Sequence, residues 1–214
     1  ESTLRFAPNA DFAKKYASSA QSRVKEVRVM DVLIAGVGGQ GTLLASRVLG
    51  KYALDSGLDC KLSEVHGMSQ RGGSVITFVR IGEKIHSPVI DEGGADVIIA
   101  FEKLEALRYS HYLKKDGMIL YSKQEIMPMP VVTGNAVYPT DAEARLPSNK
   151  FSVDALVLAE RAGNGKAANS VMLGAFAKIA NLSYDGMKAA LLACIPEKLA
   201  SVNEKAFDLG YNNM

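Results

Sequence analysis

Two glycine-rich segments contain the residue types that most plainly indicate chemistry. The first, residues 36–41 (GVGGQG), matches G-x-G-x-x-G and lies between an apolar run and a stretch with helical periodicity. Glycines in such a segment allow a tight turn and a close approach of the backbone to a ligand. The N-terminus of the following helix then offers unpaired N–H groups to an anion. The segment therefore predicts a turn that is able to bind an anionic group.

The second segment, residues 64–74 (EVHGMSQRGGS), places polar side chains among three glycines. Arg71 is suited to a bidentate pair with a phosphate or a carboxylate. His66 has no acid or nucleophile in register, and no Ser-His-Asp, metal-ligand or paired-carboxylate arrangement follows from the order of residues. On spacing alone, a ligand-facing loop and a polar connection whose glycines only serve its turns are equally good interpretations.

Three interpretations of the first segment are open at this point. A dinucleotide site needs an acidic residue at the end of the next strand for the ribose hydroxyls, and Glu64 lies 23 residues after Gly41. Alternatively, the glycines only permit close packing of a strand against a helix. In the third interpretation, the loop faces a phosphate-bearing ligand or a partner subunit.

The elements that position these segments follow from hydrophobic periodicity. An apolar strand is expected at 29–35, and a helix at 42–56 that Gly57 closes. A second strand at 61–65 completes a parallel β–α–β crossover. Residues 74–81 alternate in polarity, and a two-residue turn at Gly82 and Glu83 predicts a hairpin with 84–86 at the edge of the sheet. That hairpin counts against the dinucleotide interpretation, because a Rossmann half continues with another crossover helix.

The rest of the chain predicts further strands and a helical C-terminal third. Strands are expected at 96–100 and 117–121, the latter after a turn, an extended segment at 131–139, and helices at 102–113, 154–162, 169–180, 184–193 and 196–207. The predicted fold is therefore α/β, a single Rossmann-like domain with a mixed, mainly parallel sheet, an edge β-hairpin and a helical C-terminal third. That domain spans 29–214, and residues 1–28 are expected to form an extension that is partly helical or mobile.

Composition narrows the class of protein. The chain has 214 residues, 48% of them apolar, which is enough for one globular core. Its 25 basic and 23 acidic residues are spread along the sequence, which argues against a nucleic-acid binder. We expect a cytoplasmic protein, since neither a membrane-spanning run nor a signal-peptide pattern is evident. The two cysteines, Cys60 and Cys194, are too few for a four-thiolate iron–sulfur cluster, and we expect both to be buried as small hydrophobic residues.

Three stretches of the sequence resemble the gamma-type module of the pyruvate/2-oxoacid:ferredoxin oxidoreductase family. They are residues 36–41, residues 63–73 (SEVHGMSQRGG) and residues 96–108, which include DVIIAFE and EALR. The His-Gly-Met that precedes Ser-Gln-Arg-Gly-Gly is most similar to the indolepyruvate type. Residues 164–174 (NGKAANSVMLG) and 202–207 are also similar. The resemblance covers residue 29 to about residue 210.

The resemblance implies a subunit of an enzyme that converts a 2-oxoacid and coenzyme A to an acyl-CoA and carbon dioxide, with electrons passing to ferredoxin. It implies that thiamine diphosphate, magnesium and 4Fe–4S clusters lie in a large partner subunit, and that this chain is inactive alone. Coenzyme A would be a co-substrate. The sequence agrees, because Asn212-Asn213 has no Gly-Asp-Gly upstream to complete a diphosphate-binding pattern.

For the chain itself we expect no catalytic acid or base and no bound metal. Its glycine loops would form one polar surface that faces coenzyme A or the partner. An NAD(P)-binding Rossmann oxidoreductase and a purely structural assembly subunit are the alternatives. Indolepyruvate or another aryl pyruvate is favoured as the substrate only by the resemblance, and pyruvate, 2-oxoglutarate and branched-chain oxoacids stay open. The expected surface residues are Gly38, Gly39, Gln40, Gly41, Thr42, Ser69, Gln70, Arg71 and Gly72.

Overall fold

The computed structural model describes residues 30–64 and 73–214. Its six strands form one mixed sheet in the order β2-β3-β1-β4-β5-β6. Strands β1, β4, β5 and β6 run parallel, whereas β3 is antiparallel to both of its neighbours, β2 and β1. The strands are β1 (Met30–Val37), β2 (Asp59–Glu64), β3 (Ser74–Gly82), β4 (Ala95–Ala100), β5 (Leu113–Ser122) and β6 (Lys150–Val153).

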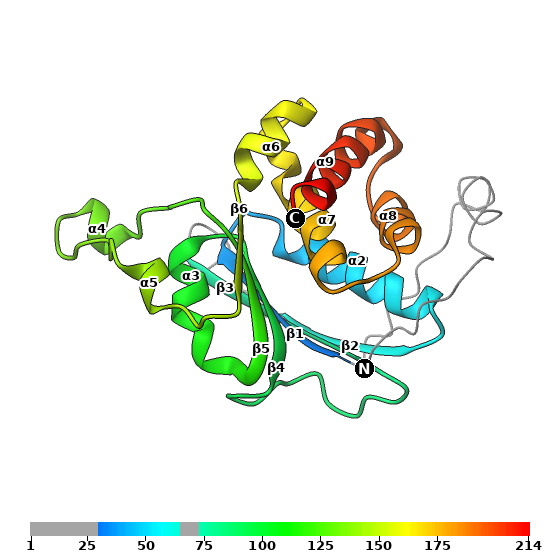
Figure 1. Ribbon diagram of the computed structural model, residues 1–214, viewed down its shortest axis with the longest axis horizontal. Coiled ribbons are helices and arrows are strands. Elements are labelled where there is room, and N and C mark those ends of the chain that lie inside the picture. Colours follow the sequence, from blue (N-terminus) through cyan, green and yellow to red (C-terminus); the bar gives the residue numbers. More distant parts are fainter. Residues whose placement is uncertain (1–29, 65–72) are drawn as a thin grey trace.

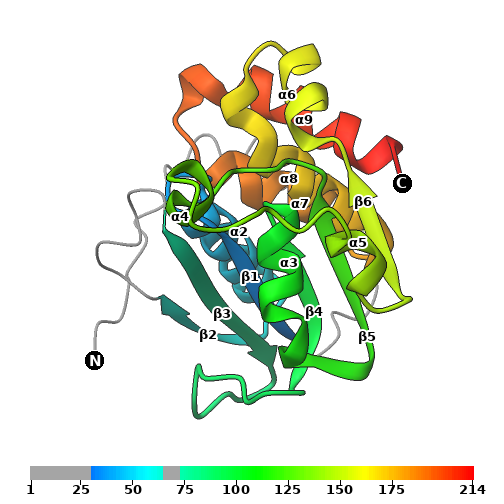
Figure 2. The ribbon, with the colours of Figure 1, turned by 90° about the vertical axis from the view of Figure 1, so that its left-hand side faces the viewer.

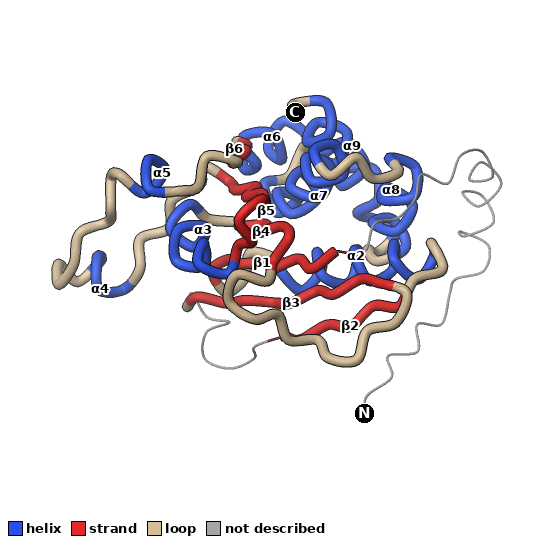
Figure 3. The backbone as a smooth tube through the Cα atoms, turned by 60° about the horizontal axis from the view of Figure 1, so that its bottom comes forward, coloured by secondary structure: helices blue, strands red, loops and turns tan. Residues whose placement is uncertain are grey.

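Helices cover both faces of this sheet, as Figures 1 and 3 show. On one face, α2 and the C-terminal helices α6 to α9 pack together, and on the other lies α3, with α5 beside it. The α-helices of the described residues are α2 (Thr42–Asp55), α3 (Lys103–Tyr109), α4 (Met129–Val132), α5 (Ala142–Arg145), α6 (Ala155–Ala162), α7 (Ala168–Ile179), α8 (Tyr184–Ala193) and α9 (Ala200–Asn212). Short 3₁₀ turns occupy η2 (Ser110–Tyr112), η3 (Gly165–Ala167) and η4 (Glu197–Leu199).

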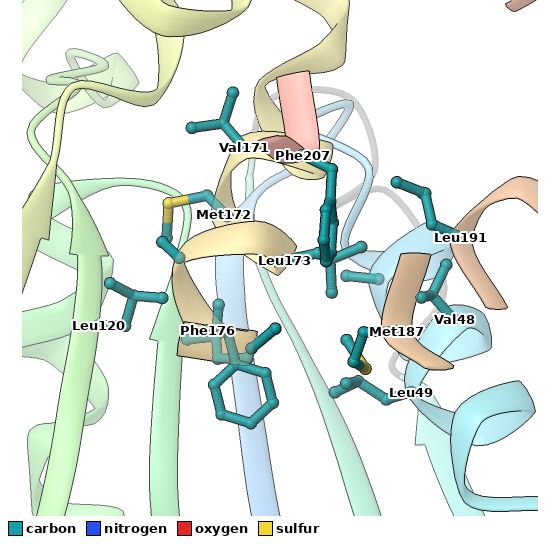
Figure 4. Close-up of a cluster of buried hydrophobic side chains, with 14 of the residues drawn as sticks. Val48, Leu49, Leu120, Val171, Met172, Leu173, Phe176, Met187, Leu191 and Phe207 are labelled. Atoms are coloured by element: carbon teal, nitrogen blue, oxygen red, sulfur yellow. The ribbon is translucent and has the colours of Figure 1, made fainter. Parts of the chain in front are cut away.

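Alternation along the central strands divides the core between the two faces. Val32 and Ile34 of β1 belong to the cluster under α2 and α7, whereas Leu33 and Ala35 belong to the cluster under α3. Successive side chains of a strand point to opposite faces, so neighbouring apolar residues of a sheet that is buried on both faces belong alternately to the two clusters. Figure 4 shows the larger cluster, in which Phe176 of α7 lies near the sheet.

The predicted fold class is confirmed, with one element corrected. The strands at 29–35 and 96–100, the helix at 42–56 and the first three C-terminal helices are present with small shifts in their ends. The helix predicted at 196–207 begins as the turn η4 and continues as α9 to Asn212. Gly57 has a φ of +79° and closes α2, as predicted. Strand β2 is parallel to β1, but β3 lies between them. The predicted hairpin of 74–81 with 84–86 is wrong, because β3 pairs with β2 and β1, and 84–86 form no strand.

Other differences are smaller. The helix expected at 102–113 ends in η2, and the predicted turn before residue 117 lies within β5. The segment at 131–139 is not wholly extended, because α4 begins before it. Strand β6 was not predicted. The extension at 1–28 lies outside the described residues, and within those residues no helix has the length and apolar character to cross a bilayer.

Candidate functional site

The first glycine segment forms a tight turn at the edge of the sheet where the parallel strands end. The Gln40 N–H donates to the Val37 carbonyl oxygen at 3.1 Å, directly after β1. Gly39 and Gly41 have φ values of +99° and +85°, a region that L-residues with side chains rarely adopt. Gly41 is the N-cap of α2, and Thr42 is its first residue. The predicted strand–turn–helix unit is therefore present.

The second glycine segment ends beside this turn. The Gly38 N–H donates to the Gly73 carbonyl oxygen at 2.9 Å, and Ser74 pairs with Val37 in the β1–β3 ladder. The end of the second segment and the first loop therefore share one edge of the sheet. The predicted surface residues Ser69, Gln70, Arg71 and Gly72 lie outside the described residues.

The Gln40 side chain joins the ends of three parallel strands. Its Oε1 accepts the Val37 N–H at 2.8 Å, and its Nε2 donates to the Phe101 carbonyl and to the Gln124 Oε1, both at 3.0 Å. Both amide hydrogens are used inside the chain. Gln40 therefore shapes the loop in this structure, a role that the sequence pattern did not reveal because its partners are 61 and 84 residues away.

The N-terminus of α2 presents hydrogen-bond donors without a carboxylate among them. The N–H groups of Thr42 and Leu43 belong to the first turn, whose donors have no acceptor within a helix. Gly41 provides no side-chain cap, and the first turn of α2 contains no acidic residue. The positive end of the helix dipole therefore favours an anion, and no carboxylate of the first turn already occupies that role.

Asn169, at the start of α7, contacts this turn from the C-terminal helices. Asn169 is 7% exposed, and its Nδ2 lies 2.5 Å from the position that a β carbon on Gly41 would occupy. Its Oδ1 accepts the Ser170 N–H at 2.8 Å, whereas its Nδ2 has no hydrogen-bond acceptor within 30–64 and 73–214. This arrangement leaves a nearly buried amide donor beside the turn. Sequence reasoning missed Asn169, although it falls within a stretch that resembles the family.

The order of the strands argues against a dinucleotide site. In a dinucleotide-binding fold, the acidic residue that binds the ribose ends the strand next to β1. Here β3 lies between β1 and β2, so Glu64 ends a strand that is one position farther away. Its Oε1 accepts a hydrogen bond from Ser46 Oγ of α2 at 3.1 Å. Glu64 is therefore engaged with α2.

Two buried carboxylates, of Glu102 and Glu105, form hydrogen bonds near the same edge of the sheet. Glu105 is 3% exposed and accepts hydrogen bonds from Ser74 Oγ and, at 3.1 Å, from Arg108 Nε. Glu102 is 1% exposed and caps α3 by accepting the Glu105 N–H at 2.9 Å. Burial and the hydrogen bond to Glu102 raise the pKa of the Tyr138 hydroxyl, so this group stays protonated as a donor. These buried side chains hold the neighbouring loops in place.

The residues of this chain do not suit the metal cofactors that the resemblance implies. A four-thiolate cluster needs four cysteines, and the chain has two. Both are free and half-buried against the larger core cluster. Within the part of the chain that the structure describes, no three His, Cys, Asp or Glu side chains gather in a way that could hold a metal ion.

Both thiols are expected to react slowly. Burial raises the pKa of the Cys60 thiol to about 12 and also raises that of Cys194. Because the thiolate is the nucleophile, alkylation by iodoacetamide at pH 8 should be at least about tenfold slower in the folded chain than in urea. Mass spectrometry of each cysteine peptide over time measures this. Equal rates in the two states would contradict the burial seen here.

Comparison with known proteins gives a consistent result. The sequence model of the pyruvate ferredoxin/flavodoxin oxidoreductase family matches residues 31–213. A curated relative, the indolepyruvate oxidoreductase subunit IorB of Pyrococcus horikoshii, is 43% identical over 188 residues, which cover 84% of this chain and 93% of the relative.

Two solved structures share the fold. The gamma subunit of a keto/oxoacid ferredoxin oxidoreductase from Geobacter sulfurreducens has a TM-score of 0.65 and 24% identity, covering 86% of this chain and 96% of its own. A 2-oxoglutarate:ferredoxin oxidoreductase from Magnetococcus marinus, solved with 2-oxoglutarate, coenzyme A and succinyl-CoA bound, has a TM-score of 0.66 and 18% identity. That match covers 88% of this chain but only 32% of the Magnetococcus chain.

The resemblance first noted in the two glycine segments is confirmed by these matches over nearly the whole described chain. The curated relative is named as a subunit of an indolepyruvate oxidoreductase. This chain belongs to the pyruvate ferredoxin/flavodoxin oxidoreductase family.

Proposed function

We propose that this chain is the small subunit of a coenzyme A-dependent indolepyruvate (or other aryl pyruvate):ferredoxin oxidoreductase. A large partner subunit would hold thiamine diphosphate, magnesium and the 4Fe–4S clusters, and this chain would complete the active complex. The 43% identity to an indolepyruvate oxidoreductase subunit supports the substrate class. The two cysteines of the chain, which are too few for a cluster, support the division of labour.

The part we assign to this chain is to bind the phosphate groups of coenzyme A. The observation that carries this assignment is the start of α2, where the nearly buried Asn169 amide lies against Gly41, the N-cap residue that precedes the N–H groups of Thr42 and Leu43. Backbone N–H groups at a helix N-terminus favour a phosphate, and a second donor fixes its position. Gly38 connects this turn to the second glycine segment, from which Arg71 would add a bidentate pair.

In this proposal the chain orients its ligand and supplies no acid, base or nucleophile. Gly39 and Gly41 allow the backbone to approach the phosphate, and Gln40 holds the turn against β4 and the end of β5. A fixed phosphate places the thiol end of coenzyme A relative to the partner, which reduces the entropic cost of the acyl-transfer step.

Co-purification tests the subunit assignment. The chain would be co-expressed with candidate large subunits and purified through a tag on this chain. Viologen reduction by indolepyruvate would then be assayed without oxygen, with and without coenzyme A. We expect a brown complex whose activity needs both chains and coenzyme A. A colourless chain that purifies alone and binds NAD(H) with micromolar affinity would instead support a dinucleotide site.

Substitutions of the proposed donors test the phosphate assignment. Arg71→Ala and Asn169→Ala should each raise the KM for coenzyme A about tenfold, with little change in the KM for the oxoacid, because each removes a hydrogen bond to a charged group. Arg161→Ala, which removes an exposed arginine of α6, is the matched control. An unchanged KM for coenzyme A in an assembled complex would support a purely structural subunit.

A further inference from the structure

An uncharged arm leaves the domain between β5 and α5. We define it as residues 126–140 (IMPMPVVTGNAVYPT), which include no acidic, basic or histidine residue. Four of its apolar side chains are exposed, with Met129 at 68% and Val137 at 88%, together with Met127 and Val132. Figure 1 shows α4, which lies within the arm, at a distance from α6 to α9, and Figure 2 shows the same arm from the side that faces the viewer. Isolated exposed apolar residues are ordinary, whereas four within eleven residues of one uncharged segment concentrate apolar exposure on the arm, as interaction sites often do.

Hydrogen bonds within the arm connect its two halves. The N–H groups of Asn135 and Ala136 both donate to the Pro130 carbonyl oxygen, at 2.8 and 3.0 Å. Thr133 Oγ1 donates to the Met129 carbonyl at 3.0 Å. Internal hydrogen bonds of this kind reduce the conformational entropy that a loop loses on binding, so more of the burial of its apolar side chains contributes to affinity.

One buried carboxylate anchors both ends of the arm. Glu102 Oε1 accepts the Ile126 N–H at 3.2 Å and the Tyr138 hydroxyl at 2.6 Å. Tyr138 is buried, whereas its neighbour Val137 is the most exposed of the four apolar residues. The arm therefore rises from the domain at a fixed point and presents its apolar side chains to the outside.

The arm begins next to the candidate phosphate site. Gln124, two residues before it, accepts a hydrogen bond from Gln40 Nε2 at 3.0 Å, and its carbonyl oxygen accepts the Lys103 N–H at 3.1 Å. The arm and the glycine turn thus occupy the same edge of the sheet.

We propose that the uncharged arm docks the large partner subunit by inserting into an apolar, uncharged groove of that subunit. This inference rests on the proposed function, because it takes the partner to be the large subunit of the oxidoreductase. An arm without charges favours a groove without charges, since burying an unpaired charge against it would be costly.

A second copy of this chain is the less suitable occupant. The described surface has a cavity of about 450 Å³, but it lies at the opposite edge of the sheet, and charged residues such as Asp96, Lys114, Lys115 and Asp116 line it. The charged lining is a poor match for the arm. In the Magnetococcus chain, moreover, the same fold accounts for 32% of a longer polypeptide, so this fold occurs joined to other domains.

The test introduces a charge on the arm and compares it with the same change elsewhere. Val132→Asp and Val137→Asp alter exposed side chains, so the fold should be retained, as a thermal melt of each complex or chain would check. Val89→Asp, at an exposed valine between β3 and β4, is the matched control. We expect each arm variant to weaken binding to the large subunit about a hundredfold or more, measured by titration of the purified subunits, and the control to bind normally.

Three results would overturn the proposal, and they are distinguishable. If the wild-type chain forms no complex with any large subunit, both the proposed function and the docking role of the arm are contradicted. If the wild-type chain binds a large subunit and both arm variants bind it with the same affinity, only the docking role of the arm is contradicted. If the wild-type chain self-associates, and the arm variants lose this self-association but keep the large subunit, then the occupant is a second copy.

Discussion

Replacing Gly174 by alanine is expected to lower the free energy of unfolding by about 3 kcal/mol or more, the upper range for overpacking a core. A β carbon at 174 would lie 2.0 Å from the Phe207 carbonyl oxygen and 2.9 Å from the Tyr211 nitrogen. Both atoms belong to the backbone of α9, so no side-chain rotation relieves the contact. Helices α7 and α9 would have to separate, which would loosen the packing around Phe207 (Figure 4).

The clash is reciprocal. A β carbon on Gly210 would lie 2.0 Å from the Val171 carbonyl oxygen, so Gly210→Ala should have a similar effect. Gly50→Ala is the control, because it is also a buried helical glycine, but its nearest contact would be an ordinary 3.6 Å from Leu62. That change should be neutral or stabilising by up to about 1 kcal/mol, since alanine favours a helix. Urea unfolding measures all three variants, and equal midpoints for Gly174→Ala and Gly50→Ala would contradict the close helix crossing.

The predictable part of the fold is that governed by local periodicity. Residues 184–193 were predicted as a helix, and α8 has these bounds, with the Ser183 hydroxyl accepting the Gly186 N–H as its cap. The apolar run of β4 was equally plain. Strand β6 was missed because its four residues alternate only briefly, and its pairing with β5 is a long-range contact. Such a short strand has too little local signal to separate it from a loop.

The incorrect hairpin shows where local turn signals mislead. Gly82 and Glu83 form a plausible hairpin turn, but both edges of β3 are already occupied by β2 and β1. The backbone groups that follow β3 form hydrogen bonds with side chains instead of with another strand. Ile85 N–H donates to Asp59 Oδ2 at 2.9 Å, and Arg80 donates to the carbonyl oxygens of residues 87 and 89. The choice of partner for β3 depends on the whole sheet, which the sequence pattern does not reveal.

The candidate site was predictable only in part for the same reason. The glycine turn has a local signature, because its positive φ values require glycine and a helix follows directly. Asn169 is far from the turn in sequence, and its contact with Gly41 depends on how α7 packs beside α2. The internal bonds of Gln40 likewise depend on which strands are neighbours. Spacing alone therefore identified the turn but not the side chains that surround it.

Replacing Glu102 by alanine is the second change for which we expect a large effect. Its carboxylate accepts three hydrogen bonds, from the Glu105 N–H, the Ile126 N–H and the Tyr138 hydroxyl. Removing it leaves buried donors unsatisfied, and each costs about 1–3 kcal/mol. Part of this cost is offset because a buried charge is also removed. We expect a net loss of about 3 kcal/mol, which corresponds to a decrease in Tm of roughly 6–12 °C for a chain of this size.

The Glu102→Ala variant should lose stability in the arm before the rest of the domain unfolds, because Glu102 is the residue to which both ends of the arm are bonded. Hydrogen exchange of residues 126–138 should increase well before the central strands exchange, and the Tyr138→Phe variant, which removes one of the three donors, should show a weaker form of the same pattern. Glu125→Gln is the control, since it alters an exposed carboxylate paired with Lys103 rather than the buried anchor. If Glu102→Ala unfolded the whole domain at once, with no faster exchange in the arm, Glu102 would stabilise the core and the arm as one unit. Faster exchange confined to the arm, together with weaker binding of the large subunit, would connect the fixed position of the arm to assembly of the complex.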